Sequence, residues 1–205
     1  MALFGDDGGR REKEKMARAE GRLPPGQSLT IKWPVLHAGG VPRFDAAKWD
    51  FRIDGMAEEP LRLTWQEFCG LPQVEVTSDF HCVTRWSRLD NRWKGVLFTE
   101  MLKRVKLREG AEYVLVLAEE GYSANVPLKD LERPDVLFAF AHDGEPLPAE
   151  HGGPLRLVVP QLYAWKSVKW VRGFTLLDHD ELGFWEHNGY HAYGDPWREQ
   201  RYSGT

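Results

Sequence analysis

The chain has 205 residues, and 27 Lys and Arg stand against 31 Asp and Glu, which gives a formal net charge of −4. This length is sufficient for one domain with a substantial core, and the near-balanced charge argues against nucleic acid or an anionic membrane surface as the main partner. No apolar run approaches the roughly 20 residues that a membrane-spanning helix requires, and two cysteines are too few for a disulfide framework.

Residues 1–30 are charged and rich in glycine, and they predict a flexible N-terminal lead-in with one short helix around residues 11–20. The pair Arg10–Arg11 is followed by Glu-Lys-Glu-Lys and not by an apolar segment. We therefore expect no export signal and a cytoplasmic location. Residues 31–205 are expected to form the functional domain.

Short strands dominate the rest of the chain. Alternating apolar and charged residues at 49–54 are typical of a half-buried strand, and Thr64 with Glu67 forms a capping-box pattern that predicts a helix start. Strands are expected at residues 49–54, 73–78, 113–117, 122–126, 136–141, 155–159 and 168–176, and short helices at residues 64–69, 99–105 and 127–132. Because no strand–helix–strand rhythm recurs, the pattern indicates an α+β fold with mixed, mainly antiparallel sheets.

Residues 80–87, Phe-His-Cys-Val-Thr-Arg-Trp-Ser, contain Cys82, one of the two cysteines. A thiol among imidazole, hydroxyl and guanidinium groups is a candidate nucleophile or soft-metal ligand. The competing interpretation is a small buried packing residue, and we interpret the other cysteine, Cys69, in that way. The segment follows an expected strand, and catalytic groups often lie just beyond strand ends.

A second segment is suited to binding an anion. Glycine lets a backbone approach an anion closely, and Lys, Arg and Ser side chains supply donors. The residues concerned are Gly152, Gly153, Arg156, Lys166, Ser167 and Lys169. They could hold a phosphate, or they could form a solvated basic rim.

Two other kinds of chemistry remain open on the residues alone. A Cys–His hydrolase would pair Cys82 with a histidine nearby in space, and His37, His142 and His151 are all possible partners. A zinc site at His187 and His191 requires a helix for that spacing, whereas the intervening Asn-Gly favours a turn.

Three blocks of the chain resemble the sulfite oxidase-like molybdopterin oxidoreductases. The blocks are residues 81–87 followed by 93–95, residues 152–160 followed by 165–170, and residues 183–186 with 195–197. The resemblance covers the chain from about Trp33 to the C-terminus. It is strongest to the single-domain bacterial branch, which includes the methionine sulfoxide reductase catalytic subunit, and it implies a sulfite oxidase-type molybdopterin-binding fold.

This resemblance implies a molybdenum and molybdopterin cofactor, with Cys82 as the one protein ligand to the metal. His81 and Arg85 are further candidates, as groups that support the site or orient the substrate; the alternative for both is a salt bridge or a hydrogen bond in the core. The residues that it implies as contacts to the pterin or its phosphate are His37, His151, Arg156, Lys166, Ser167, Val168 and Lys169.

The reaction that the resemblance implies is two-electron oxygen-atom transfer, or reduction, on a small substrate such as a sulfoxide or N-oxide. An unidentified electron donor or acceptor would be the partner. Sulfite-oxidising members carry a Cys-Ala-Gly-Asn-Arg-Arg run where this chain has Cys-Val-Thr-Arg-Trp-Ser, so sulfite is not the expected substrate. The alternative is a non-catalytic molybdopterin carrier or electron-transfer subunit.

Overall fold

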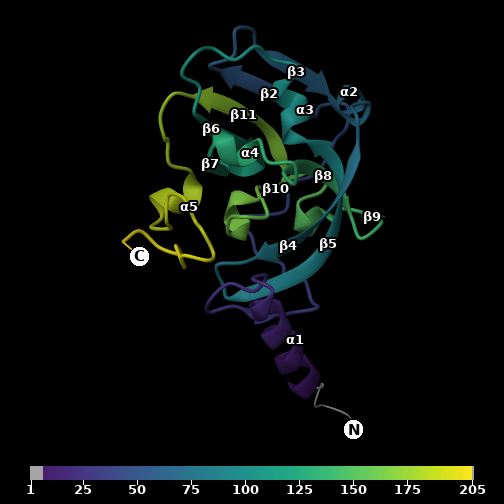
Figure 1. Ribbon diagram of the computed structural model, residues 1–205. Coiled ribbons are helices and arrows are strands. Elements are labelled where there is room, and N and C mark those ends of the chain that lie inside the picture. Colours follow the sequence, from purple (N-terminus) through teal and green to yellow (C-terminus); the bar gives the residue numbers. More distant parts are fainter. Residues whose placement is uncertain (1–6, 205) are drawn as a thin grey trace.

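A computed structural model describes residues 7–204, which form two β-sheets with short helices between and around them (Figure 1). The α-helices are α1 (Asp7–Ala19), α2 (Trp65–Cys69), α3 (Phe98–Leu102), α4 (Leu128–Leu131) and α5 (Phe184–His187). The strands are β1 (Ser28–Leu29), β2 (Asp50–Gly55), β3 (Leu61–Thr64), β4 (Val74–His81), β5 (Trp86–Leu97), β6 (Tyr113–Ala118), β7 (Ser123–Pro127), β8 (Leu137–His142), β9 (Glu145–Pro146), β10 (Arg156–Val158) and β11 (Val171–Leu177). Three 3-10 helices are η1 (Glu119–Gly121), η2 (Ala149–His151) and η3 (Ala164–Lys166).

One sheet has six strands and the other has five. The six-stranded sheet has the order β1-β5-β8-β10, with β4 also paired to β5 and β9 to β8, and the five-stranded sheet has the order β3-β2-β11-β6-β7. The pairs β1–β5 and β2–β11 are parallel, and every other strand pair in the described chain is antiparallel. The predicted α+β class with mixed, mainly antiparallel sheets is therefore confirmed.

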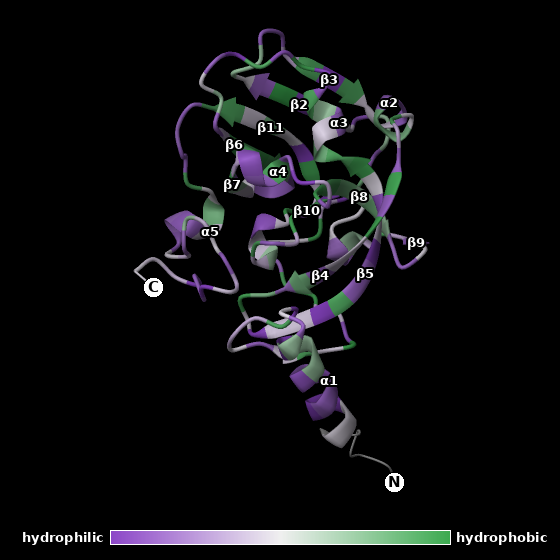
Figure 2. Ribbon diagram, viewed as in Figure 1, coloured by the Kyte–Doolittle hydropathy of each residue, from purple (hydrophilic) through white to green (hydrophobic). Residues whose placement is uncertain are grey.

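Aromatic side chains from both sheets meet in the main core. Phe51 of β2 packs edge-on against Phe138 of β8, with ring centroids 5.0 Å apart, and Phe138 lies parallel to Phe174 of β11 at 6.3 Å. In Figure 2 the strands around this core are largely apolar, whereas α1 is mostly hydrophilic. Burial of such side chains supplies the main favourable free energy of the fold, so the core holds the two sheets together.

The expected elements are present, with ends shifted by a few residues. The capping box at α2 is confirmed, because the Thr64 hydroxyl accepts a hydrogen bond from the Glu67 amide while the Glu67 carboxylate accepts one from the Thr64 amide. The long strand β5 was not predicted. Its interior contains Asp90 in the left-handed region at φ 56°, and Asp with the neighbouring Asn is typical of a turn.

The lead-in predicted at residues 1–30 begins, in its described part, with helix α1, which projects from the domain (Figure 1), and it packs against the domain from Ala17 onward; residues 1–6 lie outside the described residues. Ala17 and Leu23 are buried, and the Arg22 guanidinium donates to the Asp79 carboxylate at 2.7 and 2.9 Å. Strand β1 then pairs with β5. The flexible lead-in is thus replaced by ordered contacts from Ala17 onward, while the domain boundary at residue 30 stays a prediction. Between residues 7 and 204, no helix is long and apolar enough to cross a membrane.

Candidate functional site

Cys82 lies at the tip of the hairpin that β4 and β5 form. The last cross-strand pair is His81 with Ser87. The Cys82 amide then donates to the Trp86 carbonyl at 2.9 Å, and the Arg85 amide donates back to the Cys82 carbonyl at 3.0 Å. Arg85 takes up the tight turn in the left-handed region, at φ 72°. The paired strands β4 and β5 therefore fix the backbone of Cys82, and with it the position from which the thiol extends.

A cavity of about 320 Å³ opens beside this tip. The predicted site residues on its wall are His37, Cys82, Arg156, Ser167, Val168 and Lys169. Aromatic rings that were not singled out from the sequence form much of the remaining wall: Trp33, Trp86, Tyr122, Trp165, Trp170, Trp185 and Tyr190. Their positions along the chain follow no single period, because they come from separate loops, the start of strand β5, the 3-10 helix η3 and the helix α5. No pattern in the sequence marks them as one wall.

Arg156 is a fully buried cation at this cavity. Its guanidinium donates to the carbonyl oxygens of His151 and Ser167 at 2.8 and 2.9 Å, and its Nε atom has no hydrogen-bond partner in the structure. The guanidinium also lies 5.1 Å from the Phe80 ring centroid and 5.4 Å from that of Trp33, and such rings attract a cation. Burial lowers the pKa of Arg156 to about 9, so the side chain remains charged near neutral pH.

Lys169 is a second cation on the same wall. Its ammonium group donates to the carbonyl oxygens of Leu36 and Glu150 at 2.9 and 2.7 Å. Burial and the charge of Arg156 lower the pKa of Lys169 to about 7. Two close cations with carbonyl partners only are a favourable environment for an anion.

The thiol of Cys82 is buried, and its Sγ atom lies 3.1 Å from the Thr84 hydroxyl oxygen. Burial raises the pKa of the Cys82 thiol, while Thr84, Arg201 and Lys169 act in the opposite direction. Within residues 7–204, no histidine ring forms a hydrogen bond with this sulfur atom. A Cys–His nucleophile pair is therefore not assembled here.

Two predicted catalytic groups do not lie on the cavity wall. His81 is buried behind it, where Nδ1 lies 2.8 Å from the Ser87 hydroxyl and the ring packs edge-on against Trp197. Arg85 is exposed to solvent. The β-strand alternation that turns Cys82 toward the cavity turns His81 away from it, so the geometry offers neither side chain a direct contact with a ligand there.

Lys166 and His151 were predicted as cofactor contacts, and neither side chain lines the cavity. The Lys166 ammonium is fully buried and bound to Asn125, to the Ala192 carbonyl and to the Glu186 carboxylate. The His151 ring stacks on Trp33 with centroids 3.9 Å apart, and its buried Nδ1 atom has no hydrogen-bond partner in the structure. Lys166 thus has a complete set of protein partners, whereas His151 keeps one unused polar atom beside the cavity wall.

A zinc site at His187 and His191 also finds no support. Helix α5 ends at His187, and the His191 Nδ1 atom accepts hydrogen bonds from the backbone amides of Tyr193 and Gly194. In the part of the chain that the structure describes, no group of three or more His, Cys, Asp or Glu side chains could hold a metal ion.

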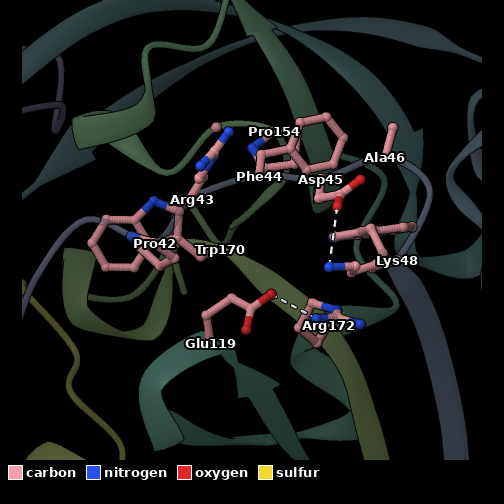
Figure 3. Close-up of a pocket in the computed structure, with 12 residues that line it drawn as sticks. Pro42, Arg43, Phe44, Asp45, Ala46, Lys48, Glu119, Pro154, Trp170 and Arg172 are labelled. Atoms are coloured by element: carbon pink, nitrogen blue, oxygen red, sulfur yellow. Dashed lines mark hydrogen bonds and ion pairs between the residues drawn. The ribbon is translucent and has the colours of Figure 1, made fainter.

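A larger cleft, of about 730 Å³, shares Trp170 with this cavity. Figure 3 shows two charged pairs in it: Lys48 points toward Asp45, and Arg172 points toward Glu119, while no dashed line joins Arg43 to an acidic side chain. Of the residues predicted to bind an anion, only Gly153 lines this cleft, and none of the predicted side-chain donors does. The smaller cavity is therefore the candidate site, because it alone combines the thiol with unpaired cations.

Residues 38–185 match the family described as "Oxidoreductase molybdopterin binding domain". The chain belongs to this family. It is a molybdopterin oxidoreductase of the sulfite oxidase-like kind, and it has the single-domain size of the family's bacterial branch.

Individual relatives agree with this assignment. The chain is 45% identical over 192 residues to the oxidoreductase YuiH of Bacillus subtilis, an alignment that covers 93% of this chain and 97% of YuiH. It is 28% identical over 169 residues to the protein-methionine-sulfoxide reductase catalytic subunit MsrP of Gluconobacter oxydans, and this match covers 74% of the chain and 54% of MsrP.

A solved structure has the same fold. The sulfane dehydrogenase SoxCD of Paracoccus pantotrophus superposes with a TM-score of 0.64 at 23% sequence identity, and the match covers 70% of this chain and 41% of SoxCD. The chain therefore spans about half or less of MsrP and SoxCD. The predicted sulfite oxidase-type molybdopterin-binding fold is confirmed.

The residues at the cavity fit the cofactor that the molybdopterin family implies. A phosphate-bearing pterin is anionic, and the buried Arg156 and the partly exposed Lys169 supply positive charge without carboxylate partners. The unpartnered Nε atom of Arg156 leaves one donor free. The thiol of Cys82 is the type of soft donor that suits a high-valent metal bound through sulfur.

Proposed function

We propose that the cavity holds a molybdenum–molybdopterin cofactor with Cys82 as the protein ligand to the metal. We further propose that the protein carries out two-electron oxygen-atom transfer, or reduction, on a small substrate such as a sulfoxide or N-oxide. One observation carries the proposal: the buried thiol of Cys82 shares one cavity with Arg156 and Lys169, two cations that lack carboxylate partners. A neutral packing cysteine would not need such neighbours.

The protein residues divide the binding work between two ends of the cavity. Arg156 and Lys169 would hold the anionic end of the pterin, with backbone groups of Ser167 and Val168 beside them. Cys82 would hold the metal end, and the β4–β5 hairpin fixes its direction. The cofactor supplies the two-electron redox chemistry when it is bound, and the chain contributes binding, orientation and charge.

The aromatic wall supports an uncharged substrate. Trp185 and Tyr190 pack in parallel with centroids 4.9 Å apart, and Trp165 packs edge-on against Tyr190 at 5.0 Å. All three rings line the cavity near Cys82. Such a wall favours a neutral or partly apolar molecule over a small dianion, because few polar groups replace the lost hydration. A sulfoxide or N-oxide meets this requirement better than sulfite.

The test is metal and pterin analysis followed by turnover. We expect protein purified from a host that makes molybdopterin to contain molybdenum and pterin in near-equal amounts. With reduced viologen as the electron donor, we expect it to reduce methionine sulfoxide or trimethylamine N-oxide. Protein from that host without molybdenum or pterin would overturn the proposal.

The alternative is a non-catalytic molybdopterin carrier or an electron-transfer subunit. The thiol and the two cations at the cavity account for cofactor binding, and binding is all that this alternative requires. This alternative predicts full cofactor content without turnover on any sulfoxide or N-oxide, from either a viologen or a flavin donor.

We also propose a cytoplasmic location. The support is the charged run at residues 12–15 directly after Arg10–Arg11, together with two free thiols, Cys69 and Cys82. Fractionation of cells that carry a C-terminally tagged chain tests it, with a known periplasmic protein as the marker. Recovery of the tag with that marker would contradict the proposal.

A further inference from the structure

Two residues outside the matched family segment hold the backbone of the Cys82 tip. The Gln27 side-chain amide donates to the carbonyl oxygen of Cys82 at 3.0 Å. The Arg201 guanidinium donates to the carbonyl oxygen of Val83 at 2.7 Å. Both donors fall outside residues 38–185, so the ends of the chain complete the environment of the thiol.

Both contacts are buried and supported by their neighbours. Gln27 is 1% exposed and Arg201 is 4% exposed. Next to Gln27, the amide of Ser28 donates to the Arg85 carbonyl at 3.0 Å, which ties the same tip from the N-terminal side. Buried hydrogen bonds of this kind are costly to lose because the freed carbonyl cannot reach water. The position of the Cys82 side chain therefore depends on two distant segments.

Arg201 also brings positive charge near the Cys82 thiol, where it favours the thiolate. It is not part of the cavity wall. Its guanidinium lies 5.0 Å from the Tyr163 ring centroid, and its ion-pair partner Glu199 is half-exposed at 3.5 Å, where solvent weakens the pairing. An anionic ligand would therefore occupy Lys169 on the cavity side while Arg201 keeps its charge for the thiolate. A cation near a thiolate stabilises the negative charge on sulfur.

We propose that Arg201 and Gln27 are positioning residues for the metal ligand. Gln27 fixes the direction of the Cys82 side chain through the Cys82 carbonyl. Arg201 fixes the same tip through the Val83 carbonyl. The positive charge of Arg201 also lowers the electron density on the thiolate, and this stabilises the more reduced state of the metal. This inference rests on the proposed function, because it requires Cys82 to bind molybdenum.

The experiment compares Arg201→Met, Arg201→Lys and Gln27→Leu with the wild type, and with Arg198→Met as a control that removes an exposed arginine three residues away. Thermal melting of each cofactor-free protein first checks the fold. Molybdenum and pterin contents are then measured, followed by a redox titration of the metal centre monitored by electron paramagnetic resonance.

We expect Arg201→Met to lower the midpoint potential of the metal, since loss of positive charge disfavours the reduced state. Arg201→Lys should keep a potential close to that of the wild type, because it retains the charge. Gln27→Leu should alter the anisotropy of the resonance signal with a smaller change in potential. Arg198→Met should change neither property.

A wild-type potential in Arg201→Met, or an equal shift in Arg198→Met, would overturn the role of Arg201. If Arg201→Met does not fold, Arg201→Lys and Gln27→Leu decide: an unchanged resonance signal in both would overturn the positioning role. Absence of molybdenum from the wild-type protein is a different result, and it would refute the proposed function itself.

Discussion

Arg156 and Lys169 line the same cavity, and neither forms an ion pair with a carboxylate among residues 7–204. The charge of Arg156 contributes to the lowered pKa of Lys169. Two cations close together repel each other in the free protein. A ligand that brings negative charge to the cavity would relieve this repulsion, which explains why both cations are present. The first two predictions follow from this pair.

Lys169→Met should weaken the binding of the anionic cofactor by about 10- to 100-fold, the usual effect of losing one hydrogen bond to a charged group. The measurement is pterin content per folded chain after gel filtration and dialysis. Lys94→Met is the matched control, because Lys94 is an exposed lysine on β5. Equal pterin content in the two variants would contradict a role for Lys169 in binding.

The cofactor-free protein should become more stable as the pH rises from about 7 to 8.5. Burial and Arg156 lower the pKa of Lys169 to about 7, whereas an unfolded lysine titrates near 10.4. The unfolded state therefore binds more protons in this window, so the free energy of unfolding increases with pH. Urea unfolding measures this slope, and the slope should become flatter in Lys169→Met; an equal slope would argue against the lowered pKa.

At lower pH, one buried and two partly buried histidines should make stability depend steeply on pH. Burial, as the largest cause, lowers the pKa of His81, His142 and His151 to about 4 in each case. Between about pH 4 and 6.5 the unfolded state binds more protons, so stability falls as the pH falls through this range. Each histidine contributes up to about 1.4 kcal/mol per pH unit.

His142→Gln tests this contribution away from the thiol. In the wild type, His142 lies against Trp33 with ring centroids 4.3 Å apart. The slope of unfolding free energy against pH, measured between pH 4.5 and 6.5, should decrease in the variant by up to about 1.4 kcal/mol per pH unit, the contribution of one titrating histidine. If the wild type and the variant show the same slope, His142 is not held neutral in the fold.

The buried pair of Lys166 and Glu186 should act on stability and not on cofactor binding. Both side chains are shielded from solvent, and Glu186 also accepts a hydrogen bond from the Trp165 indole at 2.7 Å. Lys166→Met would leave the Glu186 carboxylate buried without its cation, and we expect a loss of about 3–5 kcal/mol in the free energy of unfolding.

The double variant Lys166→Met/Glu186→Leu should recover part of that loss, because no unpaired charge remains. Pterin content per folded chain should stay near the wild-type value in both variants, in contrast to Lys169→Met. A selective loss of pterin from stable Lys166→Met protein would instead support the cofactor contact first predicted for Lys166.

The sequence predicted the elements that local patterns determine. The capping box at Thr64 and the strand β6 depend on neighbours within a few residues, and both formed as expected. Strand β5 was not predicted, because Asp90 and Asn91 resemble a turn. In the structure, Asn91 pairs with Ser78 of β4 and the residues on both sides of Asp90 stay paired with β4, so the strand continues. Local propensity was overridden there by tertiary contacts.

The candidate site, like the fold, was predicted in part from the sequence. Resemblance to the family drew attention to Cys82, Arg156 and Lys169, which the structure brings to one cavity. The direction of the Lys166 side chain depends on the backbone conformation of η3, which ends at this residue. The residue types in the segment do not determine that conformation. The contact between Arg201 and Val83 joins positions 118 residues apart, beyond the reach of any local pattern.

X-ray absorption at the molybdenum edge tests the central claim most directly. The measurement compares the number of sulfur atoms bound to the metal in wild-type protein with the number in Cys82→Ser. If Cys82 is the protein ligand, the variant should retain pterin at Arg156 and Lys169 but lose one sulfur neighbour from the metal. An identical sulfur count in the two proteins would contradict the assignment of Cys82 as the molybdenum ligand.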